Sequence, residues 1–203
     1  MSTLALDTPQ GGARVHLHPA DDAAAALVLC HGAGGGVSAR DLVAVTKVAR
    51  QVGFSVALVE QPYRVLGRRS PPRAPLLDAA WISIVEQLGD GPLSGLPLLT
   101  GGRSSGARVA CRTAAASGAV GVLCLAFPLV SPSGVSRQEE LDEAGVSVLV
   151  VQGESDRFGI PQPDPERSRS VVVVRGDHGL KSDPAAVADA AGTWLMVQLA
   201  RVG

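Results

Sequence analysis

Short runs of valine, leucine and alanine alternate along the chain with longer, alanine-rich amphipathic stretches. Most of the short runs are continuously apolar, which is typical of strands buried on both faces of a sheet. We therefore predict strands near residues 14–18, 26–31, 55–60, 96–100, 120–126, 146–152 and 171–174.

Two of the amphipathic stretches begin at recognisable helix-start signals. Ser38 and Asp41 form a capping-box sequence that predicts a helix over residues 38–51, with Gly53 after it as a stop. The last helix is predicted over residues 182–201, because a polar N-cap candidate precedes a proline at the first helical position.

A further helix is predicted over residues 75–88, ending at Gly89. The repeated order of strand, helix and strand indicates an α/β fold with a mostly parallel central sheet and helices on both faces. We expect residues 1–203 to form a single domain, because neither a break in composition nor a long polar linker divides the chain.

The composition narrows the range of partners. Hydrophobic residues make up 46% of the 203 residues and aromatic residues 3%, so the core is built mainly from Val, Leu and Ala. A net charge of -1 gives no reason to expect nucleic acid or a membrane as partner, since binding to either needs a concentrated cationic surface.

The amino terminus lacks the basic and apolar regions of a secretory signal, which predicts a cytoplasmic location.

The cysteines and early histidines do not suggest a metal site. Cys30, Cys111 and Cys124 are far apart in the sequence and lie in apolar segments, which fits reduced, packed thiols. His16 and His18 share one face of an early strand, but no third ligand is near them in the sequence. We therefore expect no metal.

Two adjacent serines stand among glycines directly after the predicted strand at 96–100. The sequence Gly-Arg-Ser-Ser-Gly of residues 102–106 fits the pattern G-x-S-x-G when it is centred on Ser104, and not on Ser105. A sharp strand-to-helix turn strains the serine backbone and leaves no room for side chains two residues before and after it. Ser104 is therefore the candidate nucleophile, with a helix predicted over 105–116 behind it.

A serine nucleophile needs a base and an acid that orients the base. His178 is the single histidine after Ser104, and it follows the last predicted strand. Asp156 comes four residues after the strand at 146–152 and is the preferred acid, with Glu154 as the nearest competitor.

A glycine-rich stretch after the strand at 26–31 is a candidate oxyanion hole. Glycines let backbone N–H groups turn toward a substrate oxygen without obstruction. We assign the oxyanion hole to the backbone amides of Ala33 or Gly34 and of Ser105. His31 is expected to shape this loop and not to act as the base.

Together these motifs resemble the α/β-hydrolase superfamily. The matching sequences are CHGAGG at 30–35, GRSSG at 102–106, GESD at 153–156 and DH at 177–178. Residues 101–104, and residues 63–71 leading into 76–81, are similar to a small, capless branch that includes the dienelactone-hydrolase-like proteins and proteins with an interaction role. The resemblance implies an α/β-hydrolase fold with a Ser-His-Asp triad and without a cofactor.

The resemblance also bears on the substrate. Dienelactone hydrolases use a cysteine nucleophile, whereas this chain has serine at that position, so their activity is not carried over. Residues 127–145 are too short for the lid domain of many α/β-hydrolases, which implies an open site for small or exposed acyl groups. Tyr63, Phe127 and Phe158 are candidate apolar walls of this site.

Arginines gather near the candidate site in the sequence. Arg64, Arg68, Arg69 and Arg73 lie in one segment after a predicted strand, and Arg103 precedes the nucleophile. If Arg68, Arg69 and Arg103 converge on the mouth of the site, the substrate is anionic, because guanidinium groups bind carboxylate or phosphate with paired hydrogen bonds.

Two functions fit this sequence. The first is a serine hydrolase that cleaves a carboxylic ester, thioester or lactone of a small-molecule acyl substrate. The second is a hydrolase-shaped binding protein with little turnover. The presence of all three side chains in hydrolase order favours the enzyme, because a scaffold has no physical need for a strained serine turn. The sequence leaves the oligomeric state open.

Overall fold

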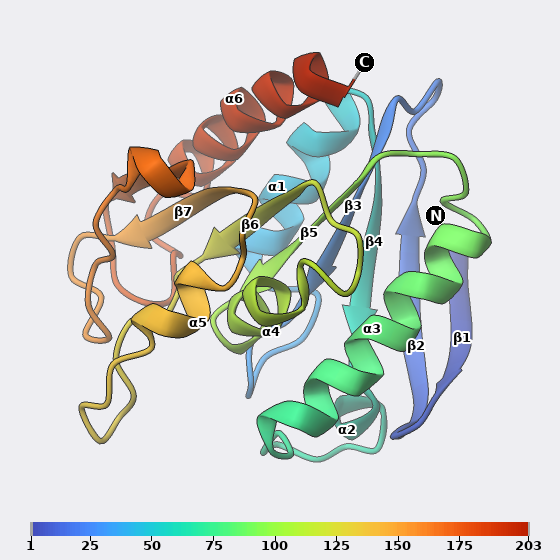
Figure 1. Ribbon diagram of the computed structural model, residues 1–203, viewed down its shortest axis with the longest axis horizontal. Helices are drawn as coiled ribbons and strands as arrows, with labels where there is room; N and C mark the ends of the chain where they lie inside the picture. Colours follow the sequence, from blue (N-terminus) through green and yellow to red (C-terminus); the bar gives the residue numbers. More distant parts are fainter. Residues whose placement is uncertain (1, 203) are drawn as a thin grey trace.

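A continuous eight-stranded sheet forms the centre of the protein (Figure 1), and the computed structural model describes residues 2–202. In their order across the sheet, the strands are β1 (Ser2–Thr8), β2 (Gly11–His18), β4 (Phe54–Glu60), β3 (Ala25–Cys30), β5 (Leu98–Arg103), β6 (Gly121–Leu125), β7 (Ser147–Gly153) and β8 (Arg169–Val174). Strand β2 is antiparallel to both of its neighbours, whereas every neighbouring pair from β4 to β8 is parallel. The carboxyl ends of the six parallel strands from β4 to β8 therefore share one edge of the sheet.

Helices cover both faces of this sheet. They are α1 (Arg40–Gln51), α2 (Pro62–Val65), α3 (Ala74–Asp90), α4 (Ser105–Thr113), α5 (Gln138–Asp142) and α6 (Pro184–Val202), with a 3-10 turn, η1, at Pro165–Arg167. Helices α1 and α6 pack on one face, where Leu42 and Leu195 meet Leu29 and Leu123 of the sheet. Helices α3, α4 and α5 cover the other face.

The predicted α/β class, with its mostly parallel sheet between helices, is confirmed, and each predicted strand is present. Strand β1 was not predicted. It pairs with β2 through a two-residue turn at Pro9 and Gln10, where the Thr8 hydroxyl donates to the Gly11 carbonyl over 2.7 Å. Its residues alternate between more and less exposed positions, as in a strand with one face in water.

The capping-box prediction at Ser38 and Asp41 is wrong. The residue before α1 is Ala39, and no side chain caps the helix. The Asp41 side chain is instead buried and points to Arg103, as described below. The helix predicted over residues 75–88 ends at Asp90, two residues later than predicted. Gly89 lies within α3 and does not stop the helix. Helix α4 ends at Thr113 and not near residue 116.

The helices and the cysteines also bear on predictions made from the sequence. Across residues 2–202 no helix has the length and apolar character needed to cross a membrane. Cys30, Cys111 and Cys124 are free and buried. Burial raises the pKa of the Cys30 thiol to about 12, so this group is protonated and a poor nucleophile at neutral pH.

A cluster of charged side chains ties α4 to its neighbouring helices. Arg112 donates to Asp78 of α3 over 2.7 and 2.9 Å and to Glu140 of α5 over 2.6 Å. Arg108 donates to both oxygens of Glu140, over 2.6 and 2.7 Å. Because paired, partly buried guanidinium–carboxylate contacts are among the stronger polar interactions, the cluster fixes the helix that follows Ser104.

We predict that Glu140→Gln lowers the free energy of unfolding by about 1 to 3 kcal/mol, because Arg108 loses its carboxylate partner and Arg112 keeps only Asp78. Burial alone raises the pKa of Glu140, but hydrogen bonds and charge from Arg108 and Arg112 outweigh it and hold the pKa below its ordinary 4.5. A carboxyl with a lowered pKa stabilises the fold above its unfolded pKa, and this stabilisation is lost as pH falls through the folded pKa.

Urea unfolding of the wild type and of Glu140→Gln therefore gives a difference that is largest at neutral pH and shrinks below about pH 4. The matched control is Glu139→Gln, since Glu139 is exposed on the same helix. A difference of equal size at every pH, or an equal effect of Glu139→Gln, would contradict the role given to Glu140.

Candidate active site

Ser104 lies on a strained turn between β5 and α4. Its backbone has φ 53° and ψ -110°, a combination that residues with side chains rarely adopt. The Ser104 N–H donates to the Leu125 carbonyl of β6 over 2.9 Å, which holds the turn at the end of the sheet. The hydroxyl therefore stands at the carboxyl edge of the parallel strands.

The flanking glycines are required by the packing of backbone on backbone. A Cβ at Gly102 would lie 2.5 Å from the Cys30 carbonyl oxygen. A Cβ at Gly106 would lie 2.6 Å from the same oxygen and 2.8 Å from that of His31. The two glycines therefore let the first turn of α4 press against the end of β3.

His178 connects Ser104 to Asp156. Its Nε2 is 2.9 Å from the Ser104 Oγ, and its Nδ1 is 2.7 Å from the Asp156 Oδ2. Because a carboxylate can only accept, Nδ1 carries a proton and Nε2 is left to accept the serine hydroxyl. Phe158 lies edge-on to the imidazole, with the ring centres 4.7 Å apart.

The Asp156 carboxylate is buried and has three donors. Besides His178, it accepts from the Phe158 N–H over 2.9 Å and from the Gln152 Nε2 over 2.8 Å. The competing acid, Glu154, is exposed two residues earlier. Among the two carboxylates considered from the sequence, the structure brings Asp156 to the histidine.

Gln152 is a residue that the sequence analysis missed. It is fully buried at the end of β7, and its Nε2 also lies 3.0 Å from the Phe127 carbonyl and 2.8 Å from the Gly159 carbonyl. The amide group thus joins the Asp156 carboxylate to the loop after β6 and to the loop after β7. In the sequence, Gln152 is recognisable only as a polar residue that ends an apolar strand.

Arg103 lies beside the candidate site, where a Cβ on Gly32 would be 3.1 Å from its Nη1, and its predicted role in substrate binding stays a prediction. Its Nε lies 2.8 Å from the Asp41 Oδ2 of α1, and its Nη2 donates to the His178 carbonyl over 2.7 Å. Asp41 is 1% exposed, and burial raises the pKa of its carboxyl although the charge of Arg103 lowers it. Arg103 thus ties the loop that carries His178 to α1.

The loop after β3 lies beside Ser104. A Cβ on Gly32 would be 3.5 Å from the Ser104 Cβ. The Gly32 carbonyl is 2.8 Å from the His31 Nδ1 and accepts from the Gly35 N–H over 3.1 Å. The Gln61 N–H donates to the His31 Nε2 over 3.1 Å, so His31 carries its proton on Nδ1. Burial lowers the pKa of His31, which keeps the ring neutral.

These bonds orient the candidate oxyanion amides. In a trans peptide the N–H points opposite to the C=O, so the Ala33 N–H points away from His31. The Tyr63 hydroxyl donates to the Ala33 carbonyl over 2.9 Å and fixes the next peptide, which carries the Gly34 N–H. Within residues 2–202, the N–H groups of Ala33, Gly34 and Ser105 donate to no protein acceptor. They are available to a substrate oxygen.

Two of the three predicted apolar walls are buried elsewhere. Phe127 is fully buried in the core beneath α4 and α5, and Tyr63 is 5% exposed and supports the loop of Ala33. Phe158 alone of the three lies against His178. The wall prediction for Phe127 is therefore wrong, because its ring has no exposed surface, whereas that for Tyr63, which lines a small hollow with Arg68, stays a prediction.

The remaining predicted binding residues are Arg68 and Arg69. Both are exposed after α2, and neither forms an ion pair within the described part of the chain. Their role in binding stays a prediction. His16 lies 3.2 Å from Glu60, and residues 2–202 hold no cluster of three or more His, Cys, Asp or Glu that could bind a metal.

Comparison with known proteins gives a sequence match to one family. A family described as an alpha/beta hydrolase domain matches residues 23–197. No curated protein matches the chain in sequence.

Solved structures share the fold at low sequence identity. Est1E from Butyrivibrio proteoclasticus is 13% identical, with a TM-score of 0.80 over 98% of this chain and 100% of that one. XC6422 from Xanthomonas campestris, described as a serine hydrolase without a lid, is 20% identical, with a TM-score of 0.71 over 95% and 94%. Dienelactone hydrolase from Anabaena variabilis is 17% identical, with a TM-score of 0.76 over 97% and 96%. Another structure of Est1E holds ferulic acid.

We predict that Gln152→Met slows the reaction of Ser104 with an organophosphonate probe by roughly tenfold to a hundredfold. The substitution preserves side-chain volume but removes the amide that holds Asp156, so the imidazole loses its fixed orientation. The rate of covalent labelling, measured by mass spectrometry, gives the effect. Thermal unfolding of the same sample reports whether the fold is intact.

Gln138→Met on the surface helix α5 is the matched control and leaves the labelling rate unchanged. Gln152→Glu puts a second carboxyl against Asp156, and we expect a larger loss that is partly recovered at lower pH, where one carboxyl is protonated. Labelling of folded Gln152→Met at the wild-type rate would exclude a positioning role for Gln152.

Proposed function

Because the chain belongs to the alpha/beta hydrolase family, we propose that it is a serine hydrolase that cleaves carboxylic ester, thioester or lactone bonds. The observation that carries the proposal is the continuous chain of hydrogen bonds from the Ser104 hydroxyl through His178 to Asp156. In these bonds the Ser104 hydroxyl can donate to Nε2 and the Nδ1–H can donate to Asp156, as general-base activation of a serine requires.

In the proposed reaction, the Ser104 Oγ attacks the acyl carbonyl while the His178 Nε2 takes the hydroxyl proton. Asp156 stabilises the resulting imidazolium and fixes its orientation. The carbonyl π electrons move to the oxygen, and when the carbonyl re-forms, the bond to the leaving group breaks. His178 returns its proton to that group. Water then attacks the acyl-serine with the same proton transfers and releases the acid.

The tetrahedral oxyanion would be stabilised by the N–H groups of Ser105 and of Ala33 or Gly34. Their freedom from protein acceptors supports this role, as does the position of Ser105 at the start of α4, where the helix dipole favours negative charge. Donors held by the fold need not reorganise when the charge develops, which is why such donors lower the barrier. The proposed reaction uses protein groups alone and needs no cofactor.

The substrate proposed for this site is a small or exposed acyl compound. Residues 126–146, between β6 and β7, contain only the five-residue helix α5, so no lid domain covers Ser104. Exposed Arg68 and Arg69 favour an acidic substituent on the substrate. A cytoplasmic setting fits three buried, unpaired thiols.

A fluorophosphonate probe tests the proposal directly. We predict stoichiometric labelling of the wild type on Ser104 and none of Ser104→Ala, because the probe reacts only with an activated hydroxyl. Ser105→Ala is the matched control, since it removes the neighbouring hydroxyl and keeps its backbone N–H, and it retains labelling. Folded wild-type protein that remains unlabelled would favour the alternative, a binding protein with little turnover.

A panel of short-chain, thio, acidic and aromatic esters, with a feruloyl ester included because Est1E binds ferulic acid, defines the acyl preference.

We predict that the double change Arg68→Gln and Arg69→Gln lowers kcat/KM for acidic esters roughly tenfold and leaves neutral esters unchanged, because only the former use the guanidinium groups. Lys47→Gln on exposed α1 is the charge control. Equal losses for acidic and neutral esters would remove the anionic preference.

A further inference from the structure

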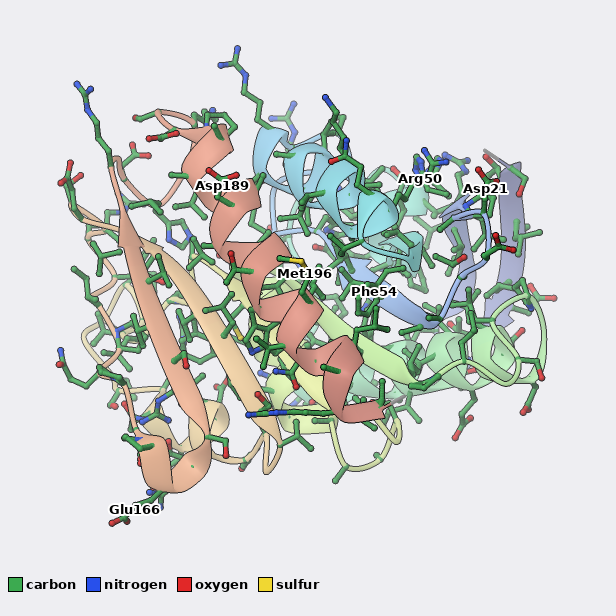
Figure 2. All side chains as sticks on the ribbon, turned by 90° about the horizontal axis from the view of Figure 1, so that it is seen from above. Asp21, Arg50, Phe54, Glu166, Asp189 and Met196 are labelled. Atoms are coloured by element: carbon green, nitrogen blue, oxygen red, sulfur yellow. The ribbon has the colours of Figure 1, made fainter. Side chains whose placement is uncertain are left out.

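An open groove lies between edge strand β8 and helix α6, away from Ser104. It encloses about 1150 Å³, and neither Ser104 nor Asp156 nor His178 lines it. Figure 2 looks onto α6, with Asp189 and Met196 labelled, and shows β7 next to the helix and β8 beyond it at the edge of the sheet. A groove of this size is not used by the proposed reaction.

Strand β8 offers an unprotected edge to this groove. Within residues 2–202 the other strand paired with β8 is β7, and on the outer side of β8 only Arg169 forms a backbone bridge, with Asp164. Beyond Arg169, the outward N–H and C=O groups of the described strand have no strand partner. Val172 is 37% exposed and Val173 50% exposed. An exposed apolar edge strand without proline or lysine favours association with another chain.

The helix beside the groove has a regular pattern of charge. Asp189, Thr193, Val197 and Arg201 recur every four residues, so they form a stripe that turns through about 120° around α6, and all four line the groove. Asp189 and Arg201, at the two ends of this stripe, are exposed, and neither forms an ion pair within the described residues. The stripe is thus acidic at one end, basic at the other and uncharged between them.

This order of charges is complementary to itself. If a second α6 lies antiparallel with the twofold axis at Leu195, Asp189 stands opposite Arg201 of the second copy, and Thr193 stands opposite Val197. The twofold symmetry forms the same ion pair a second time, at the other end of the helix pair. The two ion pairs are about 18 Å apart, because 12 residues separate positions 189 and 201 and each adds about 1.5 Å along the helix. A parallel arrangement would instead bring like charges together.

We infer that this face is an interface between two copies of the chain, in which the α6 helices pack antiparallel and cover the exposed edge of β8. The partner is a second copy because one surface supplies both charges, each at the position that the symmetry requires. The apolar side chains between the charges, Val172 and Val197, supply the buried area at the centre of the contact.

The test is a charge swap followed by analytical ultracentrifugation. We expect the wild type to sediment with twice the monomer mass of 20.7 kDa. Asp189→Arg alone and Arg201→Asp alone set like charges opposite each other, and each raises the dissociation constant at least about tenfold. The double variant Asp189→Arg with Arg201→Asp restores opposite charges in reversed order and recovers the dimer.

Asp90→Arg, which makes the same change of charge at the end of α3, is the control and leaves the dimer intact. Thermal unfolding and probe labelling show that each variant is folded, which is expected because the changed side chains are exposed. A wild type that remains monomeric at its highest soluble concentration would overturn the proposal. A folded double variant that associates no better than the single variants would overturn it too.

Discussion

The close approach of backbone to backbone at the end of β3 is the constraint on which the candidate site depends. The first turn of α4 lies against the carbonyl groups of Cys30 and His31, and positions 102 and 106 have no room for a Cβ. This contact holds Ser104 in its strained conformation and brings the loop of residues 32–34 beside it. The candidate nucleophile and the candidate oxyanion donors are thus both positioned by the packing of glycine backbone.

The strain at Ser104 persists because polar contacts hold the segments around it in place. Residues in such backbone conformations carry about 1 to 3 kcal/mol of strain, and a rigid environment has to oppose their relaxation. Arg112 holds α4 to α3, Arg103 holds the His178 loop to α1, and Gln152 holds Asp156 to two carbonyl groups. Each bond joins segments that are distant in sequence, so loosening one segment requires breaking contacts to another.

The sequence predicted the parts of the site that follow local rules. The glycine spacing around Ser104 reflects sterics within five residues, and the positions of Asp156 and His178 after their strands follow from the parallel sheet. The partners of Arg103 could not be predicted in this way, because Asp41 and the His178 carbonyl belong to segments distant in the sequence.

The contacts of Gln152, Phe127 and Tyr63 could not be predicted from the sequence for a different reason. Gln152 acts through the carbonyls of Phe127 and Gly159, and no local pattern predicts that these groups meet. A phenylalanine after a strand can line a pocket or fill the core. Which of the two it does depends on the helices that pack against that face of the sheet. The ring of Phe127 faces α4 and α5 and so fills the core.

The loop that carries His178 joins β8 to α6, so the candidate site and the groove share the same two elements. Leu180 is fully buried in the core with φ 46°, and the Ser155 N–H and hydroxyl both donate to the Gly176 carbonyl, over 3.0 and 2.9 Å. The loop is therefore held by Leu180 in the core and by the Ser155 hydrogen bonds at the surface. A second copy on α6 would cover the outer side of these elements and leave Ser104 open, since neither Ser104, Asp156 nor His178 lines the groove. The proposed association and the proposed substrate access are therefore compatible, because they use different residues.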